Sequence, residues 1–358
     1  MQHVTVYRQT GRFAAWPANY GIWGWGDEIV VGFTVGYFKS GQGFHSRDRG
    51  RPFVTMQARS LDGGETWTAE SCPARPPAGQ GLSVDEHLEP SLQAGPALRP
   101  GAFAAPARLD LTHPDFALMC ARTGLRAGAV SWFYTSTDRC RSWQGPCALP
   151  SFGLPGVAAR TDYQVLGPSD CLLFLTAAKR DGGEGRVFCS RSRDGLATFT
   201  FTSWIGEEPA GFAIMPASVR LPSGGLLVAV RCREERDGDR NWIDLYASND
   251  VGDGWGLLGR PVESTGRGGN PPTLTRLTDG RIALVYGYRD APAGLRARLS
   301  GDDGLSWCPE RVLRADAGDH DIGYPRTVQR SDGTIVTVYY HNDRPDGERY
   351  IAATLWRP

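Results

Sequence analysis

One eight-residue pattern, Ser-x-Asp-x-Gly-x-Thr-Trp, recurs along this chain and limits its fold more than any other feature. Residues 60–67 match the pattern fully, and residues 300–307 match it nearly as well. Looser copies, which keep the Ser and the Asp, start at Ser136, Ser192 and Ser248. The copies recur at intervals of roughly 50 to 80 residues, and such regular self-similarity is typical of repeat folds and propellers.

The residue types of this pattern describe a self-contained turn. An Asp carboxylate accepts hydrogen bonds from backbone N–H groups of its own turn, and Gly adopts the positive φ that a tight hairpin requires. The Trp then packs against a neighbouring strand and anchors the turn. We therefore interpret the repeated acids, such as Asp62, Asp194 and Asp302, as structural rather than catalytic.

Between two copies of the pattern, the chain follows a constant order of strand signals. A first strand starts near a proline, as at residues 16–17, 215–216 and 324–325. A turn rich in Gly follows, then a very apolar second strand such as 226–230 or 282–286, and then a third strand that runs into the pattern. Four strands in a unit of about 50 residues describe one propeller blade. The sequence thus predicts an all-β fold, a six-bladed β-propeller with four-stranded antiparallel blades.

The sixth blade has no copy of the pattern, and we expect both ends of the chain to build it. Three strand signals follow the last copy, near 324–329, 334–340 and 350–356. The N-terminal segment 3–7 is expected to supply the fourth strand, which closes the ring and removes the open edges of a half-closed propeller. We therefore expect a single domain over residues 1–358, with a long surface loop about 73–101, where Pro, Gly and Ala are frequent.

Charge and composition argue against several classes of function. The 39 basic and 39 acidic residues balance, so we expect neither a nucleic acid nor an anionic membrane as partner. No apolar run approaches the length of a membrane span. The eight cysteines are scattered without a CxxC pair, so the sequence predicts no metal site and no cofactor. The N-terminus lacks a signal-peptide pattern, which favours a cytoplasmic protein unless an export signal has been removed; the oligomeric state stays open.

The chemistry of a propeller is expected where the ends of its inner strands converge on the axis. Arg231 and Arg289 follow second strands of different blades, and Arg12, Arg160 and Asp162 stand where first strands begin. A planar guanidinium forms two parallel hydrogen bonds with a carboxylate, so arginines at equivalent ring positions favour an acidic ligand. We expect Arg231 and Arg289 to point into one central pocket.

With its blades and its repeated turns, which are known as Asp boxes, the whole chain resembles the sialidases. That resemblance implies a triad of arginines on the carboxylate of sialic acid, a tyrosine nucleophile and an aspartate as acid/base. Tyr324, in the run 324–328, looks like the nucleophile of that family. Asp48, in the run 44–48, lies where the acid/base of the family would be, and its neighbour His45 is a substrate-binding candidate.

The resemblance also implies roles for several arginines. Arg231 looks like the second arginine of the triad, and Arg289 is similar in placement to the third. Arg296 and Arg298 compete with Arg289 for that place. Arg326, two residues after the tyrosine, is a further substrate-binding candidate.

Two family positions carry other residues here. The glutamate that the family pairs with its tyrosine should open the fourth blade, where residues 215–217 read Met-Pro-Ala. The N-terminal Arg-Ile-Pro element of the family has its nearest match in residues 12–17, which read Arg-Phe-Ala-Ala-Trp-Pro. The missing glutamate matters because a tyrosine, with an ordinary pKa of about 10, is a poor nucleophile without a base nearby.

Three functions therefore stay open. The first is an exo-acting glycoside hydrolase that cleaves a terminal acidic sugar, sialic acid or a related one, with Tyr324 attacking the anomeric carbon. The second is a carbohydrate-binding propeller without turnover. The third is a lyase that acts on a uronic acid. In each case the expected partner is a small carbohydrate or the end of a glycan.

Overall fold

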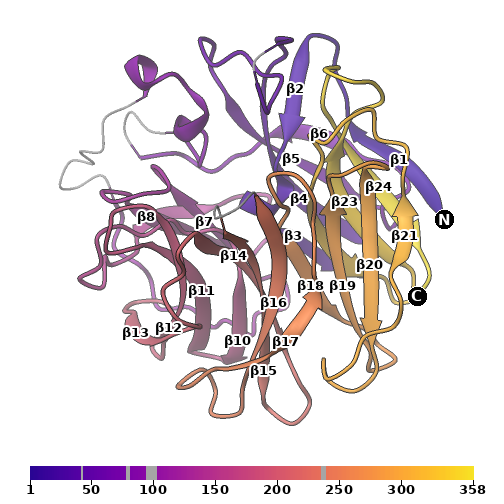
Figure 1. Ribbon diagram of the computed structural model, residues 1–358. Helices are drawn as coiled ribbons and strands as arrows, with labels where there is room; N and C mark the ends of the chain where they lie inside the picture. Colours follow the sequence, from indigo (N-terminus) through magenta and orange to yellow (C-terminus); the bar gives the residue numbers. More distant parts are fainter. Residues whose placement is uncertain (42, 78–80, 94–102, 235–238) are drawn as a thin grey trace.

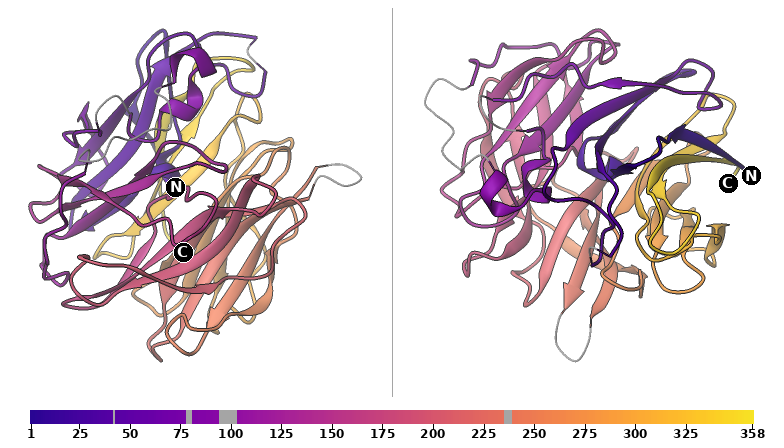
Figure 2. Two further views of the ribbon diagram at one scale, coloured as in Figure 1. Left: turned by 90° about the vertical axis from the view of Figure 1, so that its left-hand side faces the viewer. Right: turned by 90° about the horizontal axis from the view of Figure 1, so that it is seen from above.

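The structure is a computed structural model, and it describes residues 1–41, 43–77, 81–93, 103–234 and 239–358. Its strands form six antiparallel sheets, which follow one another along the chain and stand around a central axis (Figures 1 and 2). The helices in these ranges are 3-10 turns of three residues each. The fold is all-β, a six-bladed β-propeller, as the repeats predict.

Blades 3, 4 and 5 are regular four-stranded sheets, in which neighbours along the chain are also neighbours in the sheet. First strands of successive blades contact one another, which places them nearest the axis. The strands of blade 3 are β10 (Tyr163–Gly167), β11 (Asp170–Ala178), β12 (Glu184–Ser192) and β13 (Thr200–Trp204). Those of blade 4 are β14 (Phe212–Arg220), β15 (Leu226–Glu234), β16 (Arg240–Ser248) and β17 (Gly256–Val262). Those of blade 5 are β18 (Pro272–Arg276), β19 (Ile282–Tyr288), β20 (Gly294–Ser300) and β21 (Arg311–Arg314).

Blade 6 combines both ends of the chain. Its strands, from the axis outward, are β22 (Gly323–Gln329), β23 (Ile335–His341), β24 (Tyr350–Trp356) and β1 (Gln2–Tyr7). The register of the last pair places Gln2 opposite Leu355 and Thr5 opposite Ala352. The two termini consequently lie close together in Figure 2. The N-terminal strand therefore closes the ring, as predicted.

Blades 1 and 2 depart from the regular pattern. The strands of blade 1 are β2 (Arg12–Ala15), β3 (Ile22–Trp25), β4 (Glu28–Tyr37), β5 (Val54–Ser60) and β6 (Thr68–Ser71). Those of blade 2 are β7 (Ala117–Arg122), β8 (Ser131–Ser136) and β9 (Gln144–Ala148). The inner strand of blade 1 is split, because η1 (Pro17–Asn19) separates β2 from β3 and both of them pair with β4.

In blade 2, no strand precedes β7 among the described residues of the stretch 73–101. That stretch instead contains η2 (Asp85–His87) and η3 (Pro90–Leu92), and some of its side chains, such as Ser83 and His87, are buried. The Ser83 hydroxyl accepts a hydrogen bond from the last backbone N–H of β7 at 3.2 Å. Part of the expected surface loop therefore packs against the inner edge of blade 2.

The copies of the repeated pattern occupy the same place in blades 1 to 5, between the last two strands of each blade. In each copy the Ser hydroxyl donates to the Asp carboxylate over 2.7–3.0 Å and accepts a backbone N–H four residues further on. In the first copy Asp62 also accepts the backbone N–H and the hydroxyl of Thr66. These bonds with Thr66 lower the pKa of Asp62 to about 2. The carboxylates are thus satisfied within their own turns.

The hydrophobic core lies between the blades. Each large cluster of buried side chains combines residues from two neighbouring blades. Phe33 and Val35 of β4, for example, pack with Val338 and Tyr340 of β23. The second strands are buried along nearly their whole length because another blade covers each of their faces.

Two further features concern the described part of the chain as a whole. None of its helices has the length and hydropathy needed to cross a membrane. All eight cysteines lie within it, and all are free thiols.

Candidate active site

Three blades bring a residue that precedes a proline to the axis of the propeller. Trp16, Met215 and Tyr324 each stand directly before a proline, with φ of 62°, 53° and 51°. A positive φ is unusual for side chains of this size and marks a constrained backbone. In blades 4 and 6 a β-bulge lies at this point of the first strand and changes the direction of the side chain. Met215 and Tyr324 consequently meet in one small cluster with Ala18 and Ile214.

Trp16 and Tyr324 line a cavity of about 260 Å³ at this end of the axis. Most of its charged walls are cationic. The arginines that line it come from blades 1 to 4 and are Arg47, Arg122, Arg160, Arg231 and Arg233. Its histidines and acids are His45, His87, Glu86 and Glu184. Because the guanidinium groups outnumber the carboxylates, the cavity favours an anionic ligand.

Tyr324 is held against one of these arginines. Its hydroxyl accepts a hydrogen bond from Nη1 of Arg231 at 3.0 Å, while Nη2 of Arg231 donates to the carbonyl of Gly268 at 2.6 Å. The backbone N–H of Tyr324 donates to Oδ1 of Asn270 at 2.8 Å. Burial raises the pKa of the Tyr324 phenol, but the charges of Arg231 and Arg289 outweigh burial, so this pKa lies below its ordinary value. The phenolate therefore forms more readily here than in a free tyrosine.

Each acid of the cavity is paired with one arginine. Nη2 of Arg160 donates to Glu184 at 2.9 Å, and Nη2 of Arg122 donates to Glu86 at 2.6 Å. Other polar atoms in the walls are buried and have no hydrogen-bond partner among the described residues. They include Nε of Arg47, Arg122, Arg160 and Arg231, Nη1 of Arg160, Oδ1 of Asn19, Oε2 of Glu86 and Nε2 of His87. Since buried polar groups are normally hydrogen bonded, this set of atoms is suited to a polar ligand.

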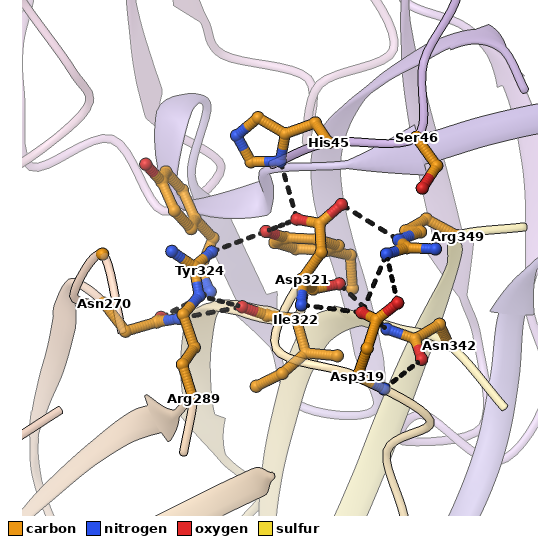
Figure 3. Close-up of polar contacts among 12 residues, drawn as sticks. His45, Ser46, Asn270, Arg289, Asp319, Asp321, Ile322, Tyr324, Asn342 and Arg349 are labelled. Atoms are coloured by element: carbon orange, nitrogen blue, oxygen red, sulfur yellow. Dashed lines mark hydrogen bonds and ion pairs between the residues drawn. The ribbon is translucent and has the colours of Figure 1, made fainter. Parts of the chain in front are cut away.

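Among the residues predicted from the sequence, Tyr324, Arg160, Arg231 and His45 line the cavity together. His45 is oriented by a buried acid, because its Nδ1 lies 2.6 Å from Oδ1 of Asp321 (Figure 3). The ring of His45 also packs edge-on against Trp16, with 5.2 Å between the ring centroids.

Arg289 does not line the cavity, and its guanidinium lies next to Tyr324 (Figure 3). Its Nε donates to the carbonyl of Ile322 at 3.1 Å, and its Nη1 donates to the carbonyl of Gly269 at 2.7 Å. Its Nη2 donates to the hydroxyl of Tyr340 at 2.6 Å. Every nitrogen of this guanidinium thus has a partner within the protein, so Arg289 supports Tyr324 electrostatically instead of facing the cavity.

Arg326 and Asp162 form a separate group on the axis, outside the cavity lining. Nη2 of Arg326 donates to the carbonyls of Ala18 and Thr161, and Nη1 lies 3.7 Å from the Asp162 carboxylate. Asp162 also accepts the backbone N–H of Ser218 at 3.1 Å. Burial raises the pKa of Asp162 to about 6. These contacts join blades 1, 3, 4 and 6, so the pair holds the blades together at the axis.

The remaining two predicted residues, Arg12 and Asp48, also lie outside the cavity lining. The Arg12 guanidinium stacks on Tyr37, 4.0 Å from the ring centroid. The Asp48 carboxylate accepts the backbone N–H of Gly50 at 3.1 Å and lies 3.8 Å from Nζ of Lys39. The structure therefore does not bring Asp48 together with Tyr324.

Five charged residues of the cavity escape prediction from the sequence; they are Arg47, Arg122, Arg233, Glu86 and Glu184. Arg122 ends β7, which corresponds to the second strand of the regular blades, so an alignment of the blades on Arg231 would have found it. Glu86 lies in the irregular stretch before β7, and Glu184 opens β12 without a repeated feature to mark it. Elsewhere, too, the described part of the chain contains no group of His, Cys, Asp or Glu side chains that could hold a metal ion.

No protein-family model matches the sequence, and no curated protein matches it. Among solved structures, a protein of unknown function from Dyadobacter fermentans DSM 18053 is similar over 99% of this chain and 97% of its own, with a TM-score of 0.72 and 22% identity. The Hadza microbial sialidase Hz136 is similar over 96% of this chain and 66% of its own, with a TM-score of 0.63 and 15% identity. The GH93 α-L-arabinofuranosidase of Fusarium graminearum, solved with arabinobiose, is similar over 100% of this chain and 98% of its own, with a TM-score of 0.63 and 13% identity. At these identities the similarity shows a shared fold.

Proposed function

We propose that this chain is a glycoside hydrolase that removes a terminal acidic sugar, with Tyr324 as its nucleophile. The observation that carries the proposal is the phenol of Tyr324, 3.0 Å from Arg231, in a cavity with an excess of arginines. The solved structures of similar fold include a sialidase and an arabinofuranosidase, which favours a sugar as substrate.

The unpartnered donors of the cavity support an acidic sugar in particular. Nε of Arg231 and both Nε and Nη1 of Arg160 are buried without a partner in the described ranges. A carboxylate offers two acceptor oxygens, and hydrogen bonds to charged groups are the stronger ones in proteins. The substrate carboxylate therefore provides the acceptors that these arginines lack.

The size of the cavity supports cleavage from the end of a glycan. About 260 Å³ is small for a ligand site, so it accommodates a single sugar ring and no longer chain. A groove of about 680 Å³ adjoins it, since Glu86 and Leu125 line both spaces. The groove is the place for the part of the glycan that leaves.

The nucleophile needs a group that accepts its proton, and Glu184 is our candidate for that base. Its negative charge acts on Tyr324, where it opposes the effect of the arginines on the phenol pKa. Arg160 holds one of its carboxylate oxygens. The phenolate then attacks the anomeric carbon, which carries positive charge in the oxocarbenium-like transition state of glycoside hydrolysis.

A screen of aryl glycosides tests this proposal, with sialic acid, related keto-sugar acids and uronic acids as the sugars. We expect release of the aryl alcohol from at least one of them, and loss of that release in Tyr324→Phe with retained binding of the sugar. Tyr288→Phe is the matched control, because Tyr288 does not line the cavity. Full activity of Tyr324→Phe would exclude the tyrosine mechanism.

One observation favours a second candidate function, a sugar-binding propeller without turnover. Met215 occupies the place expected for a catalytic glutamate, and its Sδ lies 3.9 Å from Nη1 of Arg231. Calorimetry that shows binding of an acidic sugar, without product by mass spectrometry, would favour this alternative. An unsaturated product that absorbs in the ultraviolet would instead identify a lyase.

A further inference from the structure

Asp321 is a buried carboxylate that none of the roles above uses. It is 0% exposed, and it accepts hydrogen bonds from Nδ1 of His45 at 2.6 Å, from the hydroxyl of Tyr340 at 2.7 Å and from Nε of Arg349 at 2.9 Å (Figure 3). Burial raises its pKa, but His45 and Arg349 outweigh burial and hold that pKa far below its ordinary value. Asp321 is therefore ionised, and its carboxylate can only be the acceptor in these hydrogen bonds.

The ionised Asp321 determines which nitrogen of His45 is available to a ligand. Nδ1 of His45 must donate to the carboxylate, so Nε2 carries the lone pair in the neutral ring. The His45 side chain is 22% exposed and lines the cavity, and no described residue is hydrogen bonded to its Nε2. In Figure 3 this second nitrogen points away from Asp321, toward the side on which the Tyr324 hydroxyl lies.

We propose that His45 is the acid/base of the hydrolysis and that Asp321 is its positioning residue. The inference rests on the proposed function, because a Tyr324 nucleophile needs a partner that protonates the leaving group. It assigns to His45 the role that the sequence gives to Asp48, whose carboxylate is engaged with Gly50 and Lys39 away from the cavity.

The hydrolysis takes two steps, in which the bond between Tyr324 and the sugar first forms and then breaks. The phenolate oxygen of Tyr324 bonds to the anomeric carbon, the bond from this carbon to the leaving oxygen breaks, and the leaving oxygen takes the proton from Nε2 of protonated His45. Neutral His45 then accepts a proton from water while the water oxygen bonds to the anomeric carbon. The bond between Tyr324 and the carbon breaks, and its electron pair restores the phenolate. Each cycle consumes one water molecule.

The charges around His45 determine how this pair depends on pH. Burial lowers the pKa of His45 to about 4; Asp321 opposes burial, whereas Arg47 and Arg289 add to it. His87, from the stretch before β7, also lies within electrostatic range, and Tyr340 and Arg349 reach the same carboxylate. Once Glu184 has released the proton of Tyr324 to solvent, the reactive pair of phenolate and imidazolium holds as many protons as the neutral pair. The fraction of enzyme in this reactive form therefore stays constant between the pKa of His45 and the pKa of Tyr324. As a result, kcat/KM of the wild type has a broad plateau against pH.

The test compares His45→Gln with the wild type on two glycosides of the same sugar. One has an activated aryl leaving group, which departs without an acid, and the other has an alkyl leaving group, which requires one. We expect kcat/KM to fall by about 10²–10⁴-fold for the alkyl glycoside and by about tenfold or less for the aryl glycoside. On the alkyl glycoside the residual activity of the variant should rise with pH and show no plateau, because only the phenolate of Tyr324 then matters. His113→Gln, at an exposed histidine, is the control.

Asp321→Asn provides the second variant, with the ring nitrogens of His45 followed by NMR. We expect Nδ1 to carry the proton in the wild type and the protonation of the two nitrogens to change in the variant. Equal losses of kcat/KM on both glycosides, or an unchanged plateau in His45→Gln, would overturn the assignment. If Tyr324→Phe is inactive while His45→Gln cleaves the alkyl glycoside normally, the His45 assignment alone fails. If Tyr324→Phe stays active, the proposed function fails as well.

Discussion

The repeated turns and the axis of the propeller shift the pKa of an aspartate in opposite directions. Asp62, in the first repeated turn, is exposed and accepts hydrogen bonds from Thr66, which lower its pKa to about 2. Asp162, on the axis, has a side chain that is 10% exposed, and burial raises its pKa to about 6. The regularly spaced acids are thus satisfied within their own turns, whereas the charges around the axis are irregularly spaced and are buried between blades.

The largest effect is expected from Asp162→Ala, which leaves the Arg326 guanidinium on the axis without its carboxylate. Removal of one partner of a buried ion pair costs about 3–5 kcal/mol of stability, because the other charge stays buried and uncompensated. Urea denaturation measures the change in the free energy of unfolding. A change below about 1 kcal/mol would show that the axis tolerates charge as well as the turns do.

The next effect concerns function at the axis. Arg231→Lys keeps a positive charge but loses the planar fork that reaches both Tyr324 and Gly268. We expect kcat/KM for the acidic sugar to fall by roughly 10–100-fold, since hydrogen bonds to charged groups contribute about 1.5–3 kcal/mol. Steady-state kinetics measure this, with Arg220→Lys at the exposed end of β14 as the control. Equal kinetics in the two variants would remove Arg231 from the site.

A smaller effect is expected from Asp62→Ala in the first turn. The hydrogen bonds with Ser60 and Thr66 are lost, at a cost of about 1 kcal/mol, which lowers Tm by about 1–2 °C. The value of kcat/KM per folded molecule should not change. A large loss of turnover with an unchanged melting curve would give this acid a catalytic role and end the contrast between turns and axis.

The last comparison concerns the pH dependence of stability. The folded pKa of Asp162, about 6, exceeds its ordinary 3.8. Its contribution to the free energy of unfolding is therefore fully present below pH 3.8 and is lost as pH rises through 6. The folded pKa of Asp62, about 2, is depressed, so its contribution is present above pH 3.8 and is lost as pH falls through 2. Melting curves of Asp162→Asn and Asp62→Asn should flatten in these two different windows. Flattening in the same window would contradict the assignment of opposite shifts.

The fold could be predicted from the sequence because the repeated turn depends only on residues within it. Ser60, Asp62 and Thr66 form hydrogen bonds with one another. The turn can therefore be recognised from its local sequence, without knowledge of any long-range contact. The closure by the N-terminal strand followed from a count of strands. The place of the stretch before β7 could not be predicted, since it has no periodic pattern and packs through single contacts such as that of Ser83.

The candidate site was predictable only in part. Arg231 lies in β15 and Arg289 directly follows β19, the second strands of two blades, yet Arg231 faces the cavity. Arg289 instead donates hydrogen bonds to the carbonyls of Gly269 and Ile322. That choice depends on how neighbouring blades approach each other, which the local sequence does not encode. For the same reason Asp321, which reaches His45 across two blades, gave no signal in the sequence.

The central claim is that Tyr324 is the nucleophile, and covalent trapping tests it most directly. A fluorinated acidic sugar with a good leaving group should inactivate the enzyme and add its mass to the tryptic peptide 315–326. Fragmentation should place the label on Tyr324, in a bond that hydroxylamine does not cleave. A hydroxylamine-sensitive label on Glu184 or Glu86 would contradict the account, and so would turnover of this sugar without any label on Tyr324.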